Sequence, residues 1–124
     1  MQNGINSLTL LVPLAQFDAT KQLYVELMGG KEILNMPGML VVEMSNHFIV
    51  EIYTEAFEYP TYLFEKHHSV IGFRTDQLLA MLAKLKTQHY EILSEIQYAG
   101  SCYTYFYFQD QDGQVYKMYQ HLKH

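Results

Sequence analysis

The sequence contains one cysteine, Cys102, and no tryptophan. With a single thiol, neither an internal disulfide nor a zinc site built from several cysteines can form. This usage is typical of a reducing compartment, and we expect Cys102 to be a small apolar residue within a strand. The fold must therefore be stabilised by its core, which a chain of 124 residues is long enough to bury.

Positive charge and long apolar runs are also scarce. Eight Lys and Arg stand against 13 Asp and Glu, so the net charge is −5 and no cationic surface is available to neutralise phosphates. The N-terminus lacks the pattern of a signal peptide, and no apolar run approaches the roughly 20 residues that span a bilayer. We therefore expect a cytoplasmic protein that binds neither nucleic acid nor membrane, and whose partner is a small molecule or a protein.

Tyrosine, in contrast, is abundant, with 11 residues that cluster at 53–62 and 103–107. A tyrosine ring buries well and keeps a polar tip, so such clusters suit a ligand groove, the edge of a core or a protein interface. Tyr103, Tyr105 and Tyr107 recur at every second position and must share one face of a strand. They form either the wall of a ligand site or a surface that packs against the other half of the chain or a partner chain.

The first half of the chain shows the order β-α-β-β-β. The apolar run at 7–14 predicts a strand, Asp18 is the expected N-cap of a helix, and Gly29-Gly30 stops that helix. Three strand-like runs separated by turn dipeptides follow, at 32–36, 39–44 and 47–53. Residues 55–66 then form the connection to the second half.

The second half shows the same order. A strand at 68–74 precedes a helix whose expected N-cap is Thr75 or Asp76 and whose leucines recur at helical spacing. Three more strand-like runs follow, at 91–96, 102–108 and 114–121.

The repeat is also visible in the residues themselves. Glu32-Ile33-Leu34 after the first helix recurs as Glu91-Ile92-Leu93 after the second. We therefore predict an α+β fold in which two βαβββ modules, at about 5–54 and 67–121, form curved mixed sheets around a cleft. The helices should lie on the outer face, and the whole of residues 1–124 should be a single domain.

Side chains alternate between the two faces of each predicted strand. The helix-facing set is apolar and comprises Leu10, Val12, Val50, Ile52, Ile71, Phe73, Phe106 and Phe108. The cleft-facing set is mixed and comprises Thr9, Leu11, Ile49, Glu51, Tyr53, His68, Val70, Gly72, Arg74, Tyr103, Tyr105, Tyr107 and Lys117. A ligand site is therefore expected on the second face.

Three groups of motifs carry a family resemblance. Leu23-Tyr24 and Met28-Gly29 in the first helix match a Phe-Tyr and Leu-Gly signature, and Phe73-Arg74-Thr75-Asp76 leads into the second helix. Residues 107–114 look like an aromatic-Phe-x-Asp-Pro-Asp-Gly-Asn turn, with Gln111 in place of the proline. Over essentially its whole length the chain resembles the vicinal-oxygen-chelate superfamily, which includes glyoxalase I, bleomycin-resistance proteins and extradiol dioxygenases.

Metal-using members of that superfamily place four ligands on the cleft face. By resemblance these positions fall on Thr9, Glu51, Val70 and Lys117, and only Glu51 is a competent ligand. Shifting the third ligand position by two residues along its strand would replace Val70 by His68. That shift moves the side chain by about 6.6 Å, which is too far to coordinate the same metal ion. We therefore predict no metal and no cofactor at the usual centre. The resemblance also implies a homodimer.

Several polar side chains have more than one possible role. Glu51 either forms an ion pair with Lys117 that fills the vacated metal site, or acts as a base of raised pKa or as the acceptor for a cationic ligand. His68 is the histidine we consider for acid, base or hydrogen-bonding chemistry. Arg74 either holds a carboxylate or phosphate or forms an ordinary salt bridge.

The function we favour is a small-molecule-binding protein without the usual metal centre, which encloses an aromatic or amphipathic ligand between the modules. The predicted ligand-binding residues are Thr9, Glu51, Tyr53, His68, Arg74, Tyr103, Tyr105, Tyr107 and Lys117. Catalytic residues stay unassigned. One alternative is a lyase or isomerase with a displaced metal near Glu51 and His68, or with no cofactor; another is a protein-interaction module with a filled cleft.

Overall fold

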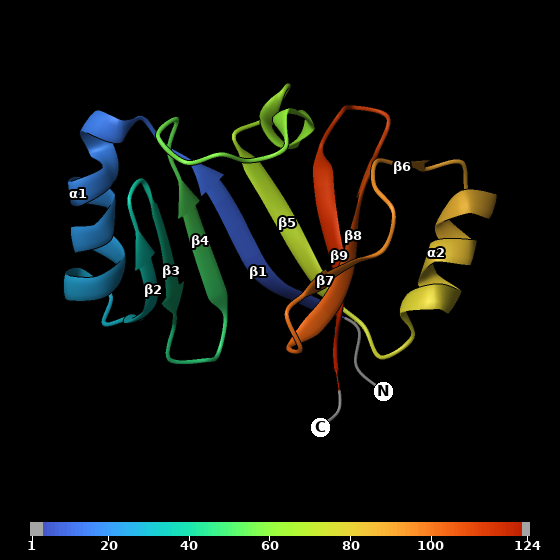
Figure 1. Ribbon diagram of the computed structural model, residues 1–124, viewed down its shortest axis with the longest axis horizontal. Helices are drawn as coiled ribbons and strands as arrows, with labels where there is room; N and C mark the ends of the chain where they lie inside the picture. The colour runs from blue at the N-terminus through green and yellow to red at the C-terminus, as the bar shows by residue number, and fades with distance from the viewer. Residues whose placement is uncertain (1–3, 123–124) are drawn as a thin grey trace.

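Two strands from opposite halves of the chain, β1 (Gly4–Leu11) and β5 (Ser69–Arg74), pair antiparallel at the centre of the sheet. Each also pairs in parallel with the last strand of its own half, which is β4 (Ile49–Tyr53) for β1 and β9 (Val115–His121) for β5. The computed structural model describes residues 4–122, and these form one nine-stranded sheet (Figure 1). The central pairing therefore joins the two halves into one surface.

The remaining elements extend the sheet on both sides. The strand order is β2-β3-β4-β1-β5-β9-β8-β6, with β7 also paired to β8. These outer strands are β2 (Lys31–Met36), β3 (Met39–Glu43), β6 (Glu91–Ile92), β7 (Gln97–Ala99) and β8 (Tyr103–Gln109). The helical segments are η1 (Leu14–Gln16), α1 (Phe17–Lys21), the π-helix η2 (Gln22–Leu27), η3 (Thr61–Phe64) and α2 (Leu78–Thr87). None of the helices among residues 4–122 is long and apolar enough to cross a membrane.

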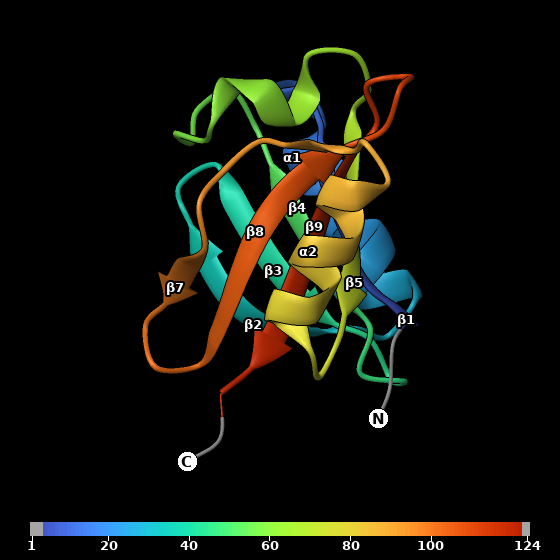
Figure 2. The same cartoon turned by 90° about the vertical axis from the view of Figure 1, so that its right-hand side faces the viewer.

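The two helical layers lie at opposite ends of the row of strands (Figure 1), and Figure 2 shows α2 lying over β8 and β9. Val50 and Ile52 pack in a core with side chains of the first helix, and Phe106 and Phe108 pack in another with side chains of α2. The predicted α+β fold with two βαβββ units, curved mixed strands and outer helices is therefore confirmed.

The caps of both helices differ from the prediction. Asp18 lies inside the first turn of α1, because the N-cap position is held by Gln16, whose side chain makes no capping hydrogen bond. At α2 the flanking residue is Gln77, and Thr75 Oγ1 accepts a hydrogen bond from its backbone N–H at 3.1 Å. The Leu78 N–H donates instead to Gln120 Oε1 of β9 at 2.9 Å, so a distant strand supplies the cap.

The strand predicted at 91–96 is interrupted. The Leu93 N–H still donates to the Tyr107 carbonyl at 2.8 Å, but the Tyr107 N–H donates to the Ser94 hydroxyl at 3.0 Å. Because a side chain replaces the backbone acceptor there, the ladder breaks and resumes at β7. Cys102, expected inside a strand, is exposed in the turn before β8.

The connection at 55–66 is part of the core. It contains η3, whose Leu63 and Phe64 are buried together with Val70 and Val115 of the sheet. Figure 1 shows this segment folding across one end of the central strands. We call the face of the sheet that points away from the helices the inner face. The connection therefore closes one end of the inner face.

The corner between the first helix and β2 depends on two glycines. Gly29 has a φ of +76°, and Gly30 packs so closely that a Cβ would lie 2.4 Å from Val42 Cγ1 and 2.7 Å from the Tyr24 carbonyl oxygen. Gly29 therefore supplies the left-handed turn that stops the helix, and Gly30 allows β2 to approach β3.

We predict that Gly30→Ala lowers the free energy of unfolding by about 1–3 kcal/mol, because the added methyl group overlaps backbone as well as side-chain atoms. The matched control is Gly4→Ala, where a Cβ meets nothing within 4 Å, and the change should stay within about 0.5 kcal/mol. Urea unfolding followed by circular dichroism measures both. Superimposable curves for the two variants would contradict the prediction.

Candidate functional site

A continuous row of rings lines the inner face of the sheet on β8 and β9. The ring centroid of Tyr105 lies 5.7 Å from that of Tyr103 and 5.6 Å from that of Tyr107. On β9, the Tyr119 ring lies 5.6 Å from Tyr103. Tyr107 and Tyr119 are buried, whereas Tyr103 and Tyr105 are half-buried and keep part of their surface accessible.

A second group of rings comes from β4 and the connection. The Tyr53 ring lies 5.9 Å from Tyr59 and 6.3 Å from Phe64, and Tyr62 lies 5.9 Å from Tyr107. The tyrosine cluster of this segment was evident in the sequence, but no local pattern indicates where a connection folds back. Tyr59, Tyr62 and Phe64 were therefore missed as neighbours of the inner face.

A buried ion pair lies between the two groups of rings. Glu51 Oε1 accepts a hydrogen bond from Thr9 Oγ1 at 2.7 Å and lies 4.0 Å from Lys117 Nζ. Lys117 Nζ also donates to the Tyr103 hydroxyl at 3.0 Å and lies 4.8 and 4.7 Å from the ring centroids of Tyr103 and Tyr105. The side chains of Lys117 and Glu51 are only 9% and 16% exposed, so the rings largely exclude water from the pair.

The surroundings keep the lysine protonated. Burial by itself would lower the pKa of Lys117, but the Glu51 carboxylate and the Tyr103 hydroxyl outweigh it, and the net shift is upward. Burial raises the pKa of Tyr53 and of Tyr107, so these phenols stay neutral. At neutral pH this part of the inner face therefore carries the Lys117 ammonium among neutral phenols.

Further polar side chains gather at the end of the inner face that lies away from η3. Asn6 Nδ2 donates to the Tyr119 hydroxyl at 2.8 Å, and the Tyr119 and His121 rings lie 5.7 Å apart. Burial and the nearby charge of Arg74 lower the pKa of His121. The Arg74 side chain is exposed, and its charge acts on both Tyr119 and His121. Tyr119 was missed in the sequence, although it lies two residues after Lys117 and so shares its face.

Comparison with protein families agrees with this fold. Residues 4–118 match the model of the Glyoxalase/Bleomycin resistance protein/Dioxygenase superfamily. The chain belongs to this superfamily. No curated protein matches the chain closely enough to serve as a relative.

Solved structures share the superfamily's architecture with this chain. A hypothetical protein from Bacillus halodurans C-125 has a TM-score of 0.74 at 12% identity, over 100% of this chain and 98% of that one. Methylmalonyl-CoA epimerase from Mycobacterium tuberculosis has a TM-score of 0.69 at 13% identity, over 97% and 89%. The 2,2',3-trihydroxybiphenyl 1,2-dioxygenase from dibenzofuran-degrading Sphingomonas wittichii strain RW1 has a TM-score of 0.72 at 13% identity, over 99% of this chain and 42% of that one. At these identities the likeness is one of fold.

The four positions that the resemblance to superfamily enzymes assigned to metal ligands do not share one level of the sheet. Thr9 pairs with Glu51 on one side and with Val70 on the other. Val70 pairs with Val115, however, and Lys117 lies two residues beyond that level. The lysine side chain is long enough to span this offset, so the Lys117 ammonium lies 4.0 Å from Glu51 although β9 and β4 are not neighbouring strands.

This set of side chains does not fit a divalent metal. Val70 and Val115 offer no donor atom, and the Lys117 ammonium repels a cation beside Glu51. Within residues 4–122, no three His, Cys, Asp or Glu side chains lie close enough together to hold an ion. His68, considered as a substitute ligand, has an exposed side chain directly before β5.

The predicted ligand-binding residues thus fall into two sets. The first set converges around the ion pair and comprises Thr9, Glu51, Tyr53, Tyr103, Tyr105, Tyr107 and Lys117. His68, directly before β5, and Arg74, its last residue, are exposed and lie outside this set. The alternation of residues along each strand predicted that the first set shares one face of the sheet. The position of a residue along its strand decided whether its side chain reaches the ion pair.

We predict that Lys117→Met lowers the free energy of unfolding by about 1–3 kcal/mol, because it removes the ammonium that balances the Glu51 carboxylate and leaves that group with the hydrogen bond from Thr9 alone. The double variant Glu51→Gln/Lys117→Met removes both charges and should recover a large part of that loss. Chemical denaturation of the wild type, both single variants and the double variant gives the coupling energy. An unchanged stability of Lys117→Met would show that the pair contributes nothing.

Proposed function

We propose that this protein is a small-molecule-binding member of the superfamily that works without the usual metal centre and encloses an aromatic or amphipathic ligand on the inner face between its two halves. The observation that carries the proposal is the Lys117 ammonium, held within 4.0 Å of Glu51 and within 5 Å of two tyrosine ring centres. The ammonium is a covalently attached cation beside the level of the sheet on which the resemblance places the first three ligand positions.

The chemistry of an ammonium limits what this site does. It donates hydrogen bonds and attracts anions, but it offers no empty orbital to an oxygen lone pair, so it does not act as a Lewis acid. Its charge is already balanced in part by Glu51. These properties favour binding and orientation of a ligand over the polarisation that metal-dependent superfamily enzymes require.

The accessible rings supply the apolar contact. Tyr103 and Tyr105 are half-buried, and Tyr53 is half-buried on the facing strand. Tyrosine combines a flat apolar surface with a hydroxyl, which suits ligands that have both aromatic and polar parts. The exposed Arg74 beyond Tyr119 is available for a carboxylate or phosphate at the outer end of such a ligand.

The other functions considered have less support. A displaced metal near Glu51 and His68 would need the exposed histidine to reach a carboxylate that Thr9 and Lys117 already contact. A cofactor-free enzyme would need a free base, yet the nearest carboxylate is paired. A small-molecule-binding protein requires neither.

We predict that a screen of aromatic and amphipathic molecules by thermal shift and NMR finds ligands whose affinity falls roughly tenfold in Tyr103→Ala or Tyr105→Ala, because each change removes a ring contact. Tyr98→Ala is the matched control, since Tyr98 on the neighbouring β7 is 70% exposed. The affinity should be unchanged by EDTA, and nickel, zinc, iron or manganese should not raise the melting temperature. Binding that requires one of these metals, or a screen without any ligand that depends on the two rings, would overturn the proposal.

We also propose that the protein is a homodimer formed along β2. This strand is at one end of the sheet, and all six of its residues are exposed. Exposed apolar side chains surround it, namely Leu23, Leu27, Met28, Ile33, Leu34 and Met36. Antiparallel pairing of β2 with its copy would satisfy the open strand edge and cover these side chains.

Light scattering should therefore give twice the mass of one chain, and Leu27→Glu/Leu34→Lys should give one chain mass because charges would be buried at the contact. Leu79→Glu on α2, where the leucine is 71% exposed, is the control and should leave the dimer intact. A wild type that stays monomeric at its highest soluble concentration would disprove the dimer.

A further inference from the structure

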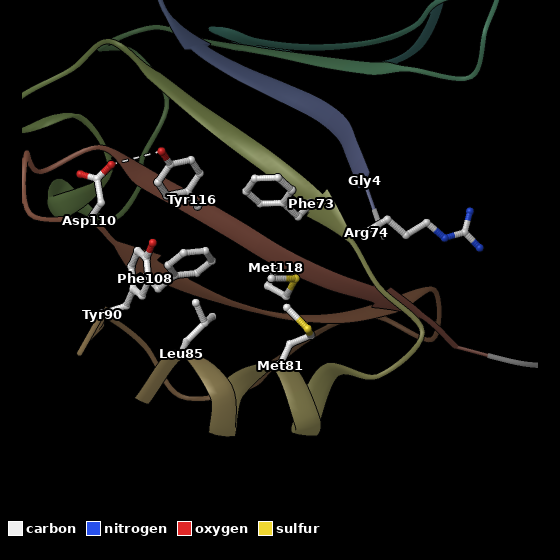
Figure 3. A pocket seen from close by; sticks show the side chains of 10 residues that line it. All are labelled: Gly4, Phe73, Arg74, Met81, Leu85, Tyr90, Phe108, Asp110, Tyr116 and Met118. Carbon is white, nitrogen blue, oxygen red and sulfur yellow. Dashed lines mark hydrogen bonds between the residues drawn. The ribbon is translucent and has the colours of Figure 1, made fainter. Parts of the chain in front are cut away.

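A pocket lies on the opposite side of the sheet from the ion pair, between α2 and the outer faces of β5, β8 and β9 (Figure 3). It has a volume of about 430 Å³ and is partly open to solvent. Pockets that bind small molecules have volumes of about 300–1,000 Å³ and are mostly apolar, with few polar groups. We call this cavity the α2 pocket; Arg74 at its edge is the one lining residue that the inner-face site also uses.

The sheet side of the α2 pocket is aromatic. The Tyr116 ring stacks with Phe73, at 5.6 Å and an interplanar angle of 30°, and with Phe108, at 5.2 Å and 20°. Tyr90 stands at 89° to Phe108, with its centroid 5.7 Å away, and lines one end of the pocket. Stacked rings beside an upright one give the pocket an aromatic lining against which a planar aromatic molecule can pack.

The roof of the pocket is adaptable. Met81 and Leu85 project from α2 toward the sheet side of the pocket, and Met118 of β9 lies beside them (Figure 3). Methionine is unbranched and polarisable, so it adjusts to ligands of different outline and contacts aromatic rings favourably. The pocket is therefore suited to flat apolar molecules as a class.

Charge decides which flat molecules fit. At the Tyr90 end, Asp110 Oδ2 accepts a hydrogen bond from the Tyr116 hydroxyl at 3.2 Å (Figure 3). Arg74 borders the other end, but its guanidinium points away from the remaining side chains of the pocket in Figure 3. An anionic ligand would thus meet a carboxylate without an inward-facing cation, whereas a ligand hydroxyl could donate to the Asp110 carboxylate.

We propose that the α2 pocket binds neutral planar aromatic molecules of two or three rings that carry a hydroxyl group. The site is independent of the inner face and does not rest on the function proposed for it. Rings of the ligand stack on Tyr116 and its neighbours, and the hydroxyl lies at Asp110.

The test uses 2-naphthol as the probe and protein labelled with ¹³C at the methionine methyl groups. Met81 and Met118 should shift on titration, while the exposed Met28 and Met36 serve as internal references. Met39 pairs with Tyr53 and reports on the inner face, so binding there would be distinguished. Naphthalene-2-carboxylate should shift Met81 and Met118 at least roughly tenfold more weakly, because its charge is repelled by Asp110.

Met81→Trp should fill the pocket and abolish the shift of Met118, whereas Leu79→Trp on the exposed face of the same helix should leave it intact. If Met81→Trp does not fold, the comparison of naphthol with the carboxylate in the wild type still decides. Absence of shifts at Met81 and Met118 up to the solubility limit of 2-naphthol would overturn the proposal. Equal affinity for the carboxylate would overturn the assigned ligand class.

Discussion

The antiparallel pairing of β1 with β5 is the constraint on which the rest of the structure depends. It is the contact through which the ladder of the first half continues into that of the second, and both parallel pairs extend from it. The strands come very close there, since a Cβ on Gly72 would lie 1.8 Å from Ser7 Oγ. Thr9 on β1 and Lys117 on β9 reach the same carboxylate because this joint fixes the distance between the two halves.

The charge at the centre of the inner face is tolerated because several weak partners act together. One carboxylate, one phenol hydroxyl and two ring faces surround the Lys117 ammonium, and together they offset the cost of removing it from water. Such an arrangement orders the rings as well as the charge. It also gives the inner face a cation that cannot dissociate, which is consistent with ligand binding that does not depend on metal supply.

The two halves share an order of elements but differ in how their helices pack. In the first half a 3-10 turn, a short α-helix and a π-helix follow one another, and their aromatic and aliphatic side chains pack against the sheet while staying partly exposed. In the second half the single regular helix α2 leaves a cavity over three roughly parallel rings. Duplicated topology therefore leaves room for each half to acquire its own surface chemistry.

The sequence by itself determined the order of the elements and the faces of the strands, because alternation and helical spacing are local properties. Its motifs also carried the resemblance to the superfamily. The sequence also indicated an ion pair between Glu51 and Lys117 as one of the roles open to Glu51. Only the tertiary structure decided that Ser94 and Gln120 replace backbone or local partners, that η3 covers one end of the inner face, and that His68 stays apart. These outcomes depend on register and long-range packing, which contacts between residues distant in sequence establish and no short pattern encodes.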